Sequence, residues 1–259
     1  MRQRPLVIGN WKMILDFVEA LHLVQQLGVL MKNHPLEHTE AVVAPPFVDL
    51  RTASSVIEAE RLAISLGAQH VNFHESGAHT GEISTAMLAR LGVEWVIVGH
   101  SERRTHYAMS DDVVAETLRA VLRAGQRAVL CVGEDLSLRE AGDFEAFVEG
   151  QLSSALAGLE ETWRPLVTVA YEPLWAIGTG VNATPEEVAT MTAFLRRALA
   201  SRGLGPARVL YGGSVTPDNA GSLVREGDVD GFLVGGASLK AEAFYAILRA
   251  CDDCYAGRR

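Results

Sequence analysis

Short runs of apolar, β-favouring residues recur along the whole chain and predict its architecture. Each run is continuous rather than alternating, as is typical of strands that are covered on both faces. Successive runs are separated by roughly 20 to 40 residues, the span of a strand and a crossover helix. The runs are Leu6–Ile8, Ala41–Ala44, Leu62–Leu66, Trp95–Val98, Ala128–Val132, Val167–Tyr171, Arg208–Tyr211 and Gly231–Val234.

The segments between these runs carry helix signals. Thr184 is a good N-cap, Pro185 suits the first helical position, and Glu187 completes a capping box. The first segment repeats apolar residues three or four positions apart, namely Phe17, Leu21, Val24 and Leu27. Strands and helices are therefore expected to alternate from one end of the chain to the other.

Eight strand–helix units without a visible linker predict a (β/α)8 barrel, a closed parallel eight-stranded barrel surrounded by helices. We expect one domain over residues 1–259, a usual size for such a barrel. A doubly wound sheet is the alternative fold. It would usually have fewer strands and a dinucleotide-binding glycine fingerprint, which Gly9–Lys12 does not provide.

Charge and cysteine content narrow the class of protein. The net charge of -9 disfavours nucleic acid or an anionic membrane as a partner. Leu6–Ile8 is too short for the apolar part of a signal peptide or for a spanning helix. Cys131, Cys251 and Cys254 do not form a disulfide framework, so we expect a cytoplasmic protein. Cys251 and Cys254 are better interpreted as neighbours on a helix than as a redox pair or half a metal site.

Polar residues and glycines follow the predicted strands, where the active sites of such barrels lie. Any one of them has an ordinary explanation, such as a solvated lysine, a structural histidine, a capping glutamate or a turn glycine. Their convergence on one rim favours a functional site. The strand ends carry Asn10 and Lys12, then Gly99–Arg104 with His100, then Glu172, Gly212–Ser214, and Gly235 with Gly236.

The glycine pairs at the last two strand ends predict a phosphate site. Glycine lacks a Cβ atom, so Gly213, Gly235 and Gly236 can bring backbone N–H groups close to an anion beside Ser214. The loops after the seventh and eighth strands are the usual phosphate site of this fold. Lys12 would supply the positive charge that the acidic chain otherwise lacks.

Glu172 and His100 predict proton abstraction next to a carbonyl group. Glu172 would take a proton from carbon, and His100 would hydrogen-bond the oxygens of the resulting enediol(ate). His100 precedes an expected helix start at Ser101, where the helix dipole disfavours a charged imidazole. The segment after Glu172, Pro173–Gly180, combines a proline, an apolar stretch and a glycine pair, as a closing lid would.

Ordered motifs over nearly the whole chain resemble those of the triosephosphate isomerase family. They are Asn10–Met13, His74–Ala78, Thr80–Glu82, Gly99–Arg104, Cys131–Glu134, Ala170–Gly180, Tyr211–Val215 and Val234–Leu239. The resemblance implies interconversion of dihydroxyacetone phosphate and glyceraldehyde 3-phosphate, with neither a cofactor nor a metal. It implies that Glu172 is the base, His100 the electrophile and Lys12 the electrostatic anchor. Asn10 would position Lys12 and the substrate oxygens, and Glu102 would be an auxiliary carboxylate near Lys12.

The resemblance also implies the remaining site residues and a partner. Gly178, Ser214, Gly235 and Gly236 match the phosphate-binding positions, and Pro173–Gly180 matches the lid. The family is usually dimeric. The segment His74–Glu82 resembles the loop that enters the neighbouring subunit, with Thr80 reaching the partner's site, so we expect an isologous homodimer.

The sequence departs from the family pattern at places that affect the subunit interface and the lid. These departures are Ile14 for an asparagine, His79 for an aromatic residue, Met109 and Thr117 for a glutamate and a lysine, and Val181–Ala183 in the lid hinge. They leave the reaction class untouched. They leave open the interface strength, the lid kinetics, the catalytic rate and any regulation.

Three other functions compete with this interpretation. The first is an isomerase of a related sugar phosphate, such as a four-carbon ketose phosphate. The second is a non-catalytic barrel that serves as a scaffold. The third is a metal-dependent hydrolase, for which His70, His74, Glu75 and His79 lie close in sequence without a defined ligand pattern.

Overall fold

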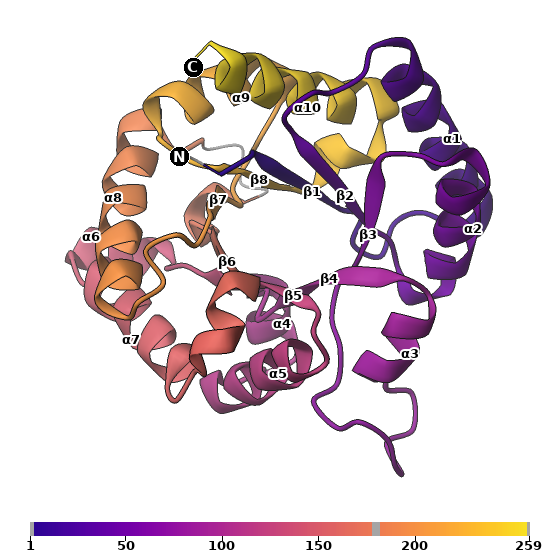
Figure 1. Ribbon diagram of the computed structural model, residues 1–259. Coiled ribbons are helices and arrows are strands. Elements are labelled where there is room, and N and C mark those ends of the chain that lie inside the picture. Colours follow the sequence, from indigo (N-terminus) through magenta and orange to yellow (C-terminus); the bar gives the residue numbers. More distant parts are fainter. Residues whose placement is uncertain (1–2, 178–181, 258–259) are drawn as a thin grey trace.

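Eight parallel strands form a closed barrel in the computed structural model, which describes residues 3–177 and 182–257 (Figure 1). The strands pair in chain order, and β8 closes the ring against β1. This closure confirms the predicted barrel and excludes the doubly wound sheet. The strands are β1 (Leu6–Asn10), β2 (Glu40–Ala44), β3 (Ile64–Ala68), β4 (Val93–Val98), β5 (Arg127–Val132), β6 (Val167–Tyr171), β7 (Val209–Tyr211) and β8 (Gly231–Val234).

Helices surround the barrel in Figure 1. The described α-helices are α1 (Phe17–Asn33), α2 (Leu50–Glu60), α3 (Thr85–Arg90), α4 (Ser101–His106), α5 (Asp111–Arg123), α6 (Leu136–Ala141), α7 (Phe144–Leu156), α8 (Pro185–Ser201), α9 (Pro217–Glu226) and α10 (Ala241–Ala256). Short 3₁₀ helices are η1 (Phe47–Asp49), η2 (Glu161–Leu166), η3 (Leu174–Ala176) and η4 (Gly236–Leu239).

Some local predictions from the sequence differ from the structure. The third strand begins at Ile64, not Leu62, because Arg61 adopts a left-handed conformation (φ 51°) and the Leu62 N–H bonds back to the Ile57 carbonyl. Leu62 therefore lies in the turn that follows α2, before the strand begins. In α1, Phe17 is exposed although its spacing suggested the buried face. The predicted cap of α8 is confirmed, since Thr184 and Glu187 form the capping box.

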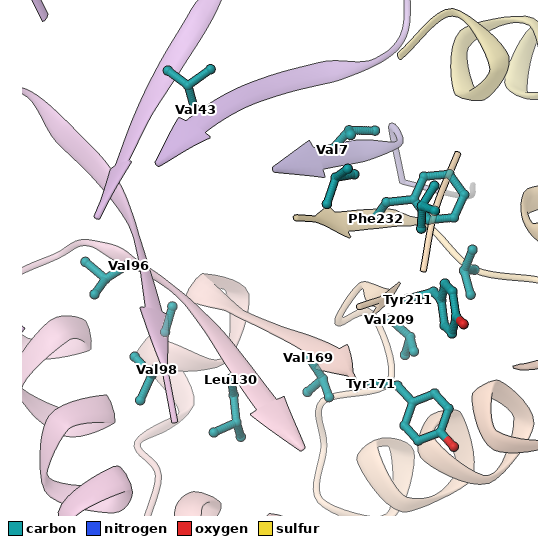
Figure 2. Packing of buried hydrophobic residues seen from close by; sticks show 14 of the residues in the cluster. Val7, Val43, Val96, Val98, Leu130, Val169, Tyr171, Val209, Tyr211 and Phe232 are labelled. Atoms are coloured by element: carbon teal, nitrogen blue, oxygen red, sulfur yellow. The ribbon is translucent and has the colours of Figure 1, made fainter. Parts of the chain in front are cut away.

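The barrel strands bury side chains on both faces, as their continuous apolar pattern predicted. One face packs under the helices, and Figure 2 shows Val7, Val43, Val169 and Phe232 from this outer layer. Alternate residues of the strands form a separate cluster inside the barrel: Leu6, Ile8, Val42, Ala44, Trp95, Ile97, Val129, Cys131, Ala170, Leu210 and Leu233. Successive side chains of a strand point to opposite faces, so this alternation also fixes where the residues at the strand ends lie.

The three cysteines are buried and free, and Cys251 and Cys254 lie on α10 as expected. Among the described residues, no helix has both the length and the apolar character needed to cross a membrane.

Candidate functional site

A cavity of about 310 Å³ lies at the carboxyl ends of the strands. Several predicted site residues line it: Asn10, Lys12, His100, Gly213, Ser214, Gly235 and Gly236. They follow β7, β8 and β1, which are neighbours in the closed barrel, and β4, which lies across the barrel from them. Reading the strand ends therefore predicted this convergence. The predicted residue Gly178 and the hinge residue Val181 lie outside the described residues.

Lys12 is held in an unusual backbone conformation at the end of β1. Its φ is 53°, a left-handed value that is uncommon for a residue with a side chain. The Lys12 N–H donates to Asn10 Oδ1 at 3.1 Å, and the Gln69 amide donates to the carbonyls of Lys12 (2.8 Å) and Ala44 (2.9 Å). The ammonium group lies 2.6 Å from Glu102 Oε1. Asn10, Lys12 and Glu102 are thus in direct contact, and Gln69 fixes the loop.

His100 is the N-cap of α4, as its position before Ser101 predicted. Its Nδ1 accepts the Glu102 N–H at 3.2 Å, and its Nε2 lies 2.9 Å from Glu172 Oε1. An acceptor nitrogen carries no proton, so this hydrogen bond requires a proton on Nε2 alone, as in a neutral imidazole. The proton on His100 Nε2 therefore points to the Glu172 carboxylate.

Glu172 follows β6 and is only 2 % exposed. Its Oε2 accepts the Ser101 N–H at 2.9 Å. Burial raises the pKa of Glu172, but the His100 side chain and the Ser101 N–H lower it more, so the pKa lies below the ordinary value. Burial lowers the pKa of His100, but Glu172 raises it more. The start of α4 and the contact at Nδ1 therefore favour the neutral form of His100, whereas the Glu172 carboxylate favours its charged form.

Glu172 does not line the cavity of Lys12 and Ser214. It borders a neighbouring cavity of about 190 Å³ together with Gly99, Ser101 and Cys131. His100 lies between Glu172 on one side and the cavity of Lys12 on the other. The structure therefore brings the carboxylate to the edge of the main cavity through its contact with His100.

Glycines bring backbone close to Lys12 and form one wall of the main cavity. A Cβ atom on Gly235 would lie 3.4 Å from Lys12 Cε, and one on Gly236 would meet no atom within 4 Å. The Asn219 side chain donates to the Ser214 carbonyl at 3.1 Å and ties the β7 loop to α9. Ser214, Gly235 and Gly236 thus line the same cavity as Lys12.

Glu134 anchors the described first part of the predicted lid, a role that the sequence analysis missed. It is completely buried, and its Oε1 accepts hydrogen bonds from the Tyr171 hydroxyl and the Trp175 indole, both at 2.9 Å. Its carbonyl accepts the Leu174 N–H at 2.9 Å. Only its place in the motif Cys131–Glu134 could have drawn attention to it.

The segment His74–Glu82 projects from the barrel between β3 and α3 (Figure 1). Every residue from His74 to Glu82 is exposed, and the rings of His74 and His79 stack with their centroids 4.1 Å apart. Met109 and Thr117, two of the expected departures from the family pattern, are both buried. No group of three or more histidine, cysteine or acidic residues suited to a metal ion occurs in residues 3–177 and 182–257.

The closed parallel barrel, with a carboxylate, a histidine and a lysine gathered at the carboxyl ends of its strands, defines a (β/α)8-barrel enzyme. Comparison with known proteins defines the class further. The family model described as triosephosphate isomerase matches residues 5–251.

The relatives agree with this match. The chain is 48% identical to the triosephosphate isomerase of Saccharopolyspora erythraea over 248 residues, 94% of this chain and 95% of the relative. It is 45% identical to that of Corynebacterium diphtheriae over 251 residues, and 44% identical to that of Mycobacterium avium over 248 residues. Both alignments cover 94% of this chain and 95% of the relative. The chain belongs to the triosephosphate isomerase family.

Proposed function

We propose that this chain interconverts dihydroxyacetone phosphate and D-glyceraldehyde 3-phosphate through an enediol(ate), the reaction of glycolysis and gluconeogenesis that its relatives are named for. The observation that supports this best is the 2.9 Å approach of His100 Nε2 to Glu172, beside a cavity that Lys12 and glycines line. The reaction moves one proton between neighbouring carbons and moves hydroxyl protons with it. A base and a hydrogen-bond donor suffice, so we propose that it needs neither a cofactor nor a metal.

Glu172 is proposed as the base. In the described arrangement its two oxygens contact His100 and the Ser101 N–H, at the edge of the substrate cavity. A rotation of this side chain would exchange both contacts for a substrate carbon. Its lowered pKa keeps it ionised at neutral pH, so it is ready to accept a proton.

His100 is proposed as the electrophile. Its Nε2 proton, which points to Glu172 in the described arrangement, becomes free for the substrate oxygens once Glu172 turns to the carbon. Removing the contact with Glu172 also removes the main influence that raises the pKa of His100. The neutral form of His100 is then more stable than before. The imidazole would then donate to the carbonyl oxygen and stabilise the enediolate.

Lys12, Asn10 and Glu102 are proposed to set the electrostatics of the site. The Lys12 ammonium would face the negative charge of the phosphate and of the enediolate, while its contact with Glu102 fixes its position. Asn10 is proposed to bind the substrate and to hold the Lys12 backbone. Ser214, Gly235, Gly236 and Gly178 are proposed to bind the phosphate, and Pro173–Gly180 to exclude water when it closes.

The proposal is tested with purified protein and both triose phosphates. Glu172→Gln removes the base without changing its size, and kcat should fall on the order of a hundredfold to ten-thousandfold. Glu172→Asp should lower kcat as well, because it withdraws the carboxylate from the carbon. Glu140→Gln, an exposed glutamate on α6, is the matched control and should keep full activity.

Wild-type turnover in either Glu172 variant would contradict its role as base. Robust isomerase activity in the wild type excludes a non-catalytic scaffold. The ratio of kcat/KM for the triose and for a four-carbon ketose phosphate decides between the two sugar isomerases.

We further propose that the chain forms an isologous homodimer through the loop His74–Glu82, with Thr80 reaching the partner's site. Exposed large apolar residues support this, because they concentrate in the segments after β1 and β2: Met13, Ile14, Phe17, Val18, Phe47 and Val48. Apolar patches of this kind mark protein interfaces.

The dimer is tested by sedimentation. Wild-type protein should sediment as a dimer, and Val48→Asp should shift it toward the monomer because it places a charge in the proposed interface. Val29→Asp is the control, because Val29 is an exposed apolar residue of α1 outside the proposed interface segments. A monomeric wild type would contradict the proposal.

One catalytic domain over residues 1–259 and a cytoplasmic location complete the proposal. All eight strands belong to one barrel sheet, which supports a single domain, and the three free cysteines support a reducing compartment. Limited proteolysis should leave one protected core, and cell fractionation should recover the protein with the cytosol.

A further inference from the structure

A second cavity, of about 390 Å³, lies at the opposite mouth of the barrel. Its lining comes from η2 and the start of β6, from the start of β5, and from residues 203–208 before β7. These are amino ends of strands, whereas the proposed active site lies at the carboxyl ends. The two cavities share no lining residue among those the structure describes.

Arginines concentrate in this cavity although the chain as a whole is acidic, with a net charge of -9. Arg127, Arg164 and Arg208 line it, and Glu161 is its acidic residue. Arg127 and Arg208 come two residues before Val129 and Leu210, which belong to the inner cluster of the barrel. By the alternation of a strand, both arginines lie on the inward face of the barrel, under its amino-end opening.

The guanidinium groups retain unused hydrogen-bond donors. Arg208 is 7% exposed and pairs with Glu40 at 2.6 Å, but its Nε has no partner among the described residues. The buried Nε of Arg164 is likewise unpartnered in the described part of the chain. Both Nε atoms are buried away from the cavity surface, so Arg164 and Arg208 line the cavity through their other side-chain atoms.

The positive charges of Arg127 and Arg164 are also incompletely neutralised. Arg127 lies over the Trp95 ring, 5.2 Å from its centroid, and forms no ion pair with a residue of the described ranges. Arg164 Nη1 lies 3.3 Å from Glu161, whose side chain is 85% exposed and therefore strongly screened by water. An anion in the cavity would meet two positive charges that the described carboxylates neutralise only weakly.

The remaining wall is apolar and holds Arg164 in place. A Cβ atom on Gly203 would lie 2.6 Å from Arg164 Nη1, so the glycine allows the guanidinium to lie against the backbone. The apolar lining is Pro165, Leu166, Val167, Leu204, Pro206 and Ala207. The cavity thus combines cationic donors with a small apolar surface.

We propose that this amino-end cavity binds a small organic anion, with a carboxylate or phosphate head group and a short apolar body. Arg127 and Arg164 hold the head group, since a guanidinium can donate two parallel hydrogen bonds to either oxyanion. Arg208, which lines the same cavity, adds positive charge, and the prolines and leucines contact the body. The site does not depend on the proposed isomerase activity.

Calorimetric titration with benzoate and with phenyl phosphate tests the proposal, since these probes share an apolar body and differ in head group. Wild-type protein should bind one molecule per chain in the cavity. The double variant Arg127→Gln/Arg164→Gln should weaken that binding at least about tenfold, because each lost charged hydrogen bond is worth roughly that factor. Arg90→Gln, an exposed arginine on α3, should bind as the wild type does.

The variant Lys12→Met separates the two mouths of the barrel. Binding that survives in Lys12→Met and weakens in the double arginine variant supports the amino-end site, and the tighter probe identifies the preferred head group. Binding lost in Lys12→Met, binding equal in wild type and double variant, or no binding of either probe would each overturn the proposal.

Two further measurements keep the test decisive if the double variant is unstable. Arg164→Gln alone changes a side chain at the rim of the cavity and should weaken binding several-fold. Crystals soaked with 4-bromobenzoate should give an anomalous bromine peak between Arg127 and Arg164. A peak only at other places would overturn the proposal.

Discussion

The two mouths of the barrel carry opposite kinds of chemistry on the same eight strands. At the carboxyl ends, backbone groups of Gly235 and Gly236 lie beside Lys12, and Glu172 contacts His100. At the amino ends, arginines that flank or begin the strands dominate, and Arg208 is fixed by Glu40. Arginine stays charged at every relevant pH, so these guanidinium groups can bind an anion but cannot act as a base.

The difference teaches that a polar cavity in a barrel is not by itself an active site. In the proposed mechanism, Glu172 exchanges its contacts with His100 and Ser101 for a contact with the substrate. At the amino-end mouth, Glu40 pairs with Arg208 and Glu161 faces solvent. Catalysis needs a charged group that can move between partners, whereas binding needs groups that stay in place.

The largest expected effect is on kcat/KM, and it distinguishes Lys12 at the carboxyl-end mouth from Arg127 at the amino-end mouth. Lys12→Met should lower kcat/KM on the order of a hundredfold to a thousandfold, because it removes preorganised positive charge from the developing enediolate. Arg127→Gln should leave kcat/KM unchanged. Steady-state assays in both directions measure this, and equal losses in the two variants would break the distinction between the mouths.

A glycine-to-alanine change at either mouth, Gly133→Ala or Gly231→Ala, should destabilise the fold. The two variants should differ in their effect on activity. A Cβ on Gly133 would lie 1.7 Å from the Glu172 carbonyl oxygen, and one on Gly231 would lie 1.9 Å from the Leu6 carbonyl oxygen. Each variant should lose about 1–3 kcal/mol or more in urea unfolding, as overpacked sites do.

The kcat of the folded fraction should fall only in Gly133→Ala, because only that change displaces the backbone of Glu172. Gly150→Ala in α7, where a Cβ meets no atom within 4 Å, is the control and should not destabilise. Equal loss of kcat in Gly133→Ala and Gly231→Ala would show that the mouths are coupled through the barrel.

Asp252 tests stability near the amino ends, independently of activity. Its carboxylate accepts the N–H groups of Glu37, His38 and Thr39 just before β2. Asp252→Asn should lower the free energy of unfolding by about 1–2 kcal/mol at pH 7, because it removes charged hydrogen bonds. Its kcat should be unchanged.

The pH dependence of this loss has a definite sign. Burial raises the pKa of Asp252, but the three backbone N–H groups lower it more, to below the ordinary 3.8. The contribution is therefore complete above pH 3.8 and disappears as the pH falls through the lowered pKa. Urea unfolding of both proteins should differ most at neutral pH, and a difference that grew on acidification would contradict the assignment.

The smallest effect is a change in the pKa of His100. Glu172 raises this pKa and burial lowers it, so Glu172→Gln should move it downward, below that of the wild type. NMR titration of the imidazole resonances measures the shift, with the other histidines as internal references. An unchanged or higher pKa would show that Glu172 does not control the protonation of His100.

The sequence predicted the barrel well because burial on both faces makes its strands continuous apolar runs. It predicted Lys12, His100, Ser214 and the glycine pairs because the end of each correctly located strand indicates the rim. Gln69 follows β3 directly, but its role depends on hydrogen bonds to the backbone of Lys12 and Ala44, which a sequence does not show.

Two other kinds of residue could not be identified from the sequence. Glu134 was noted only within a motif, because a sequence does not show that a glutamate is completely buried under an indole and a phenol. The arginines at the amino ends resemble ordinary solvated charges. Their convergence depends on the inward alternation inside a closed barrel, which becomes visible only with the strand register.

The left-handed backbone of Lys12 has a consequence for how this position can evolve. A residue with a Cβ atom is disfavoured at φ 53°, and glycine would adopt that conformation without strain. Selection for stability alone would thus replace Lys12 with glycine, which has no ammonium group. A library of variants at position 12 should therefore yield glycine when it is sorted for heat resistance and lysine when it is sorted for activity. The residue that the fold prefers differs from the one that the proposed chemistry requires.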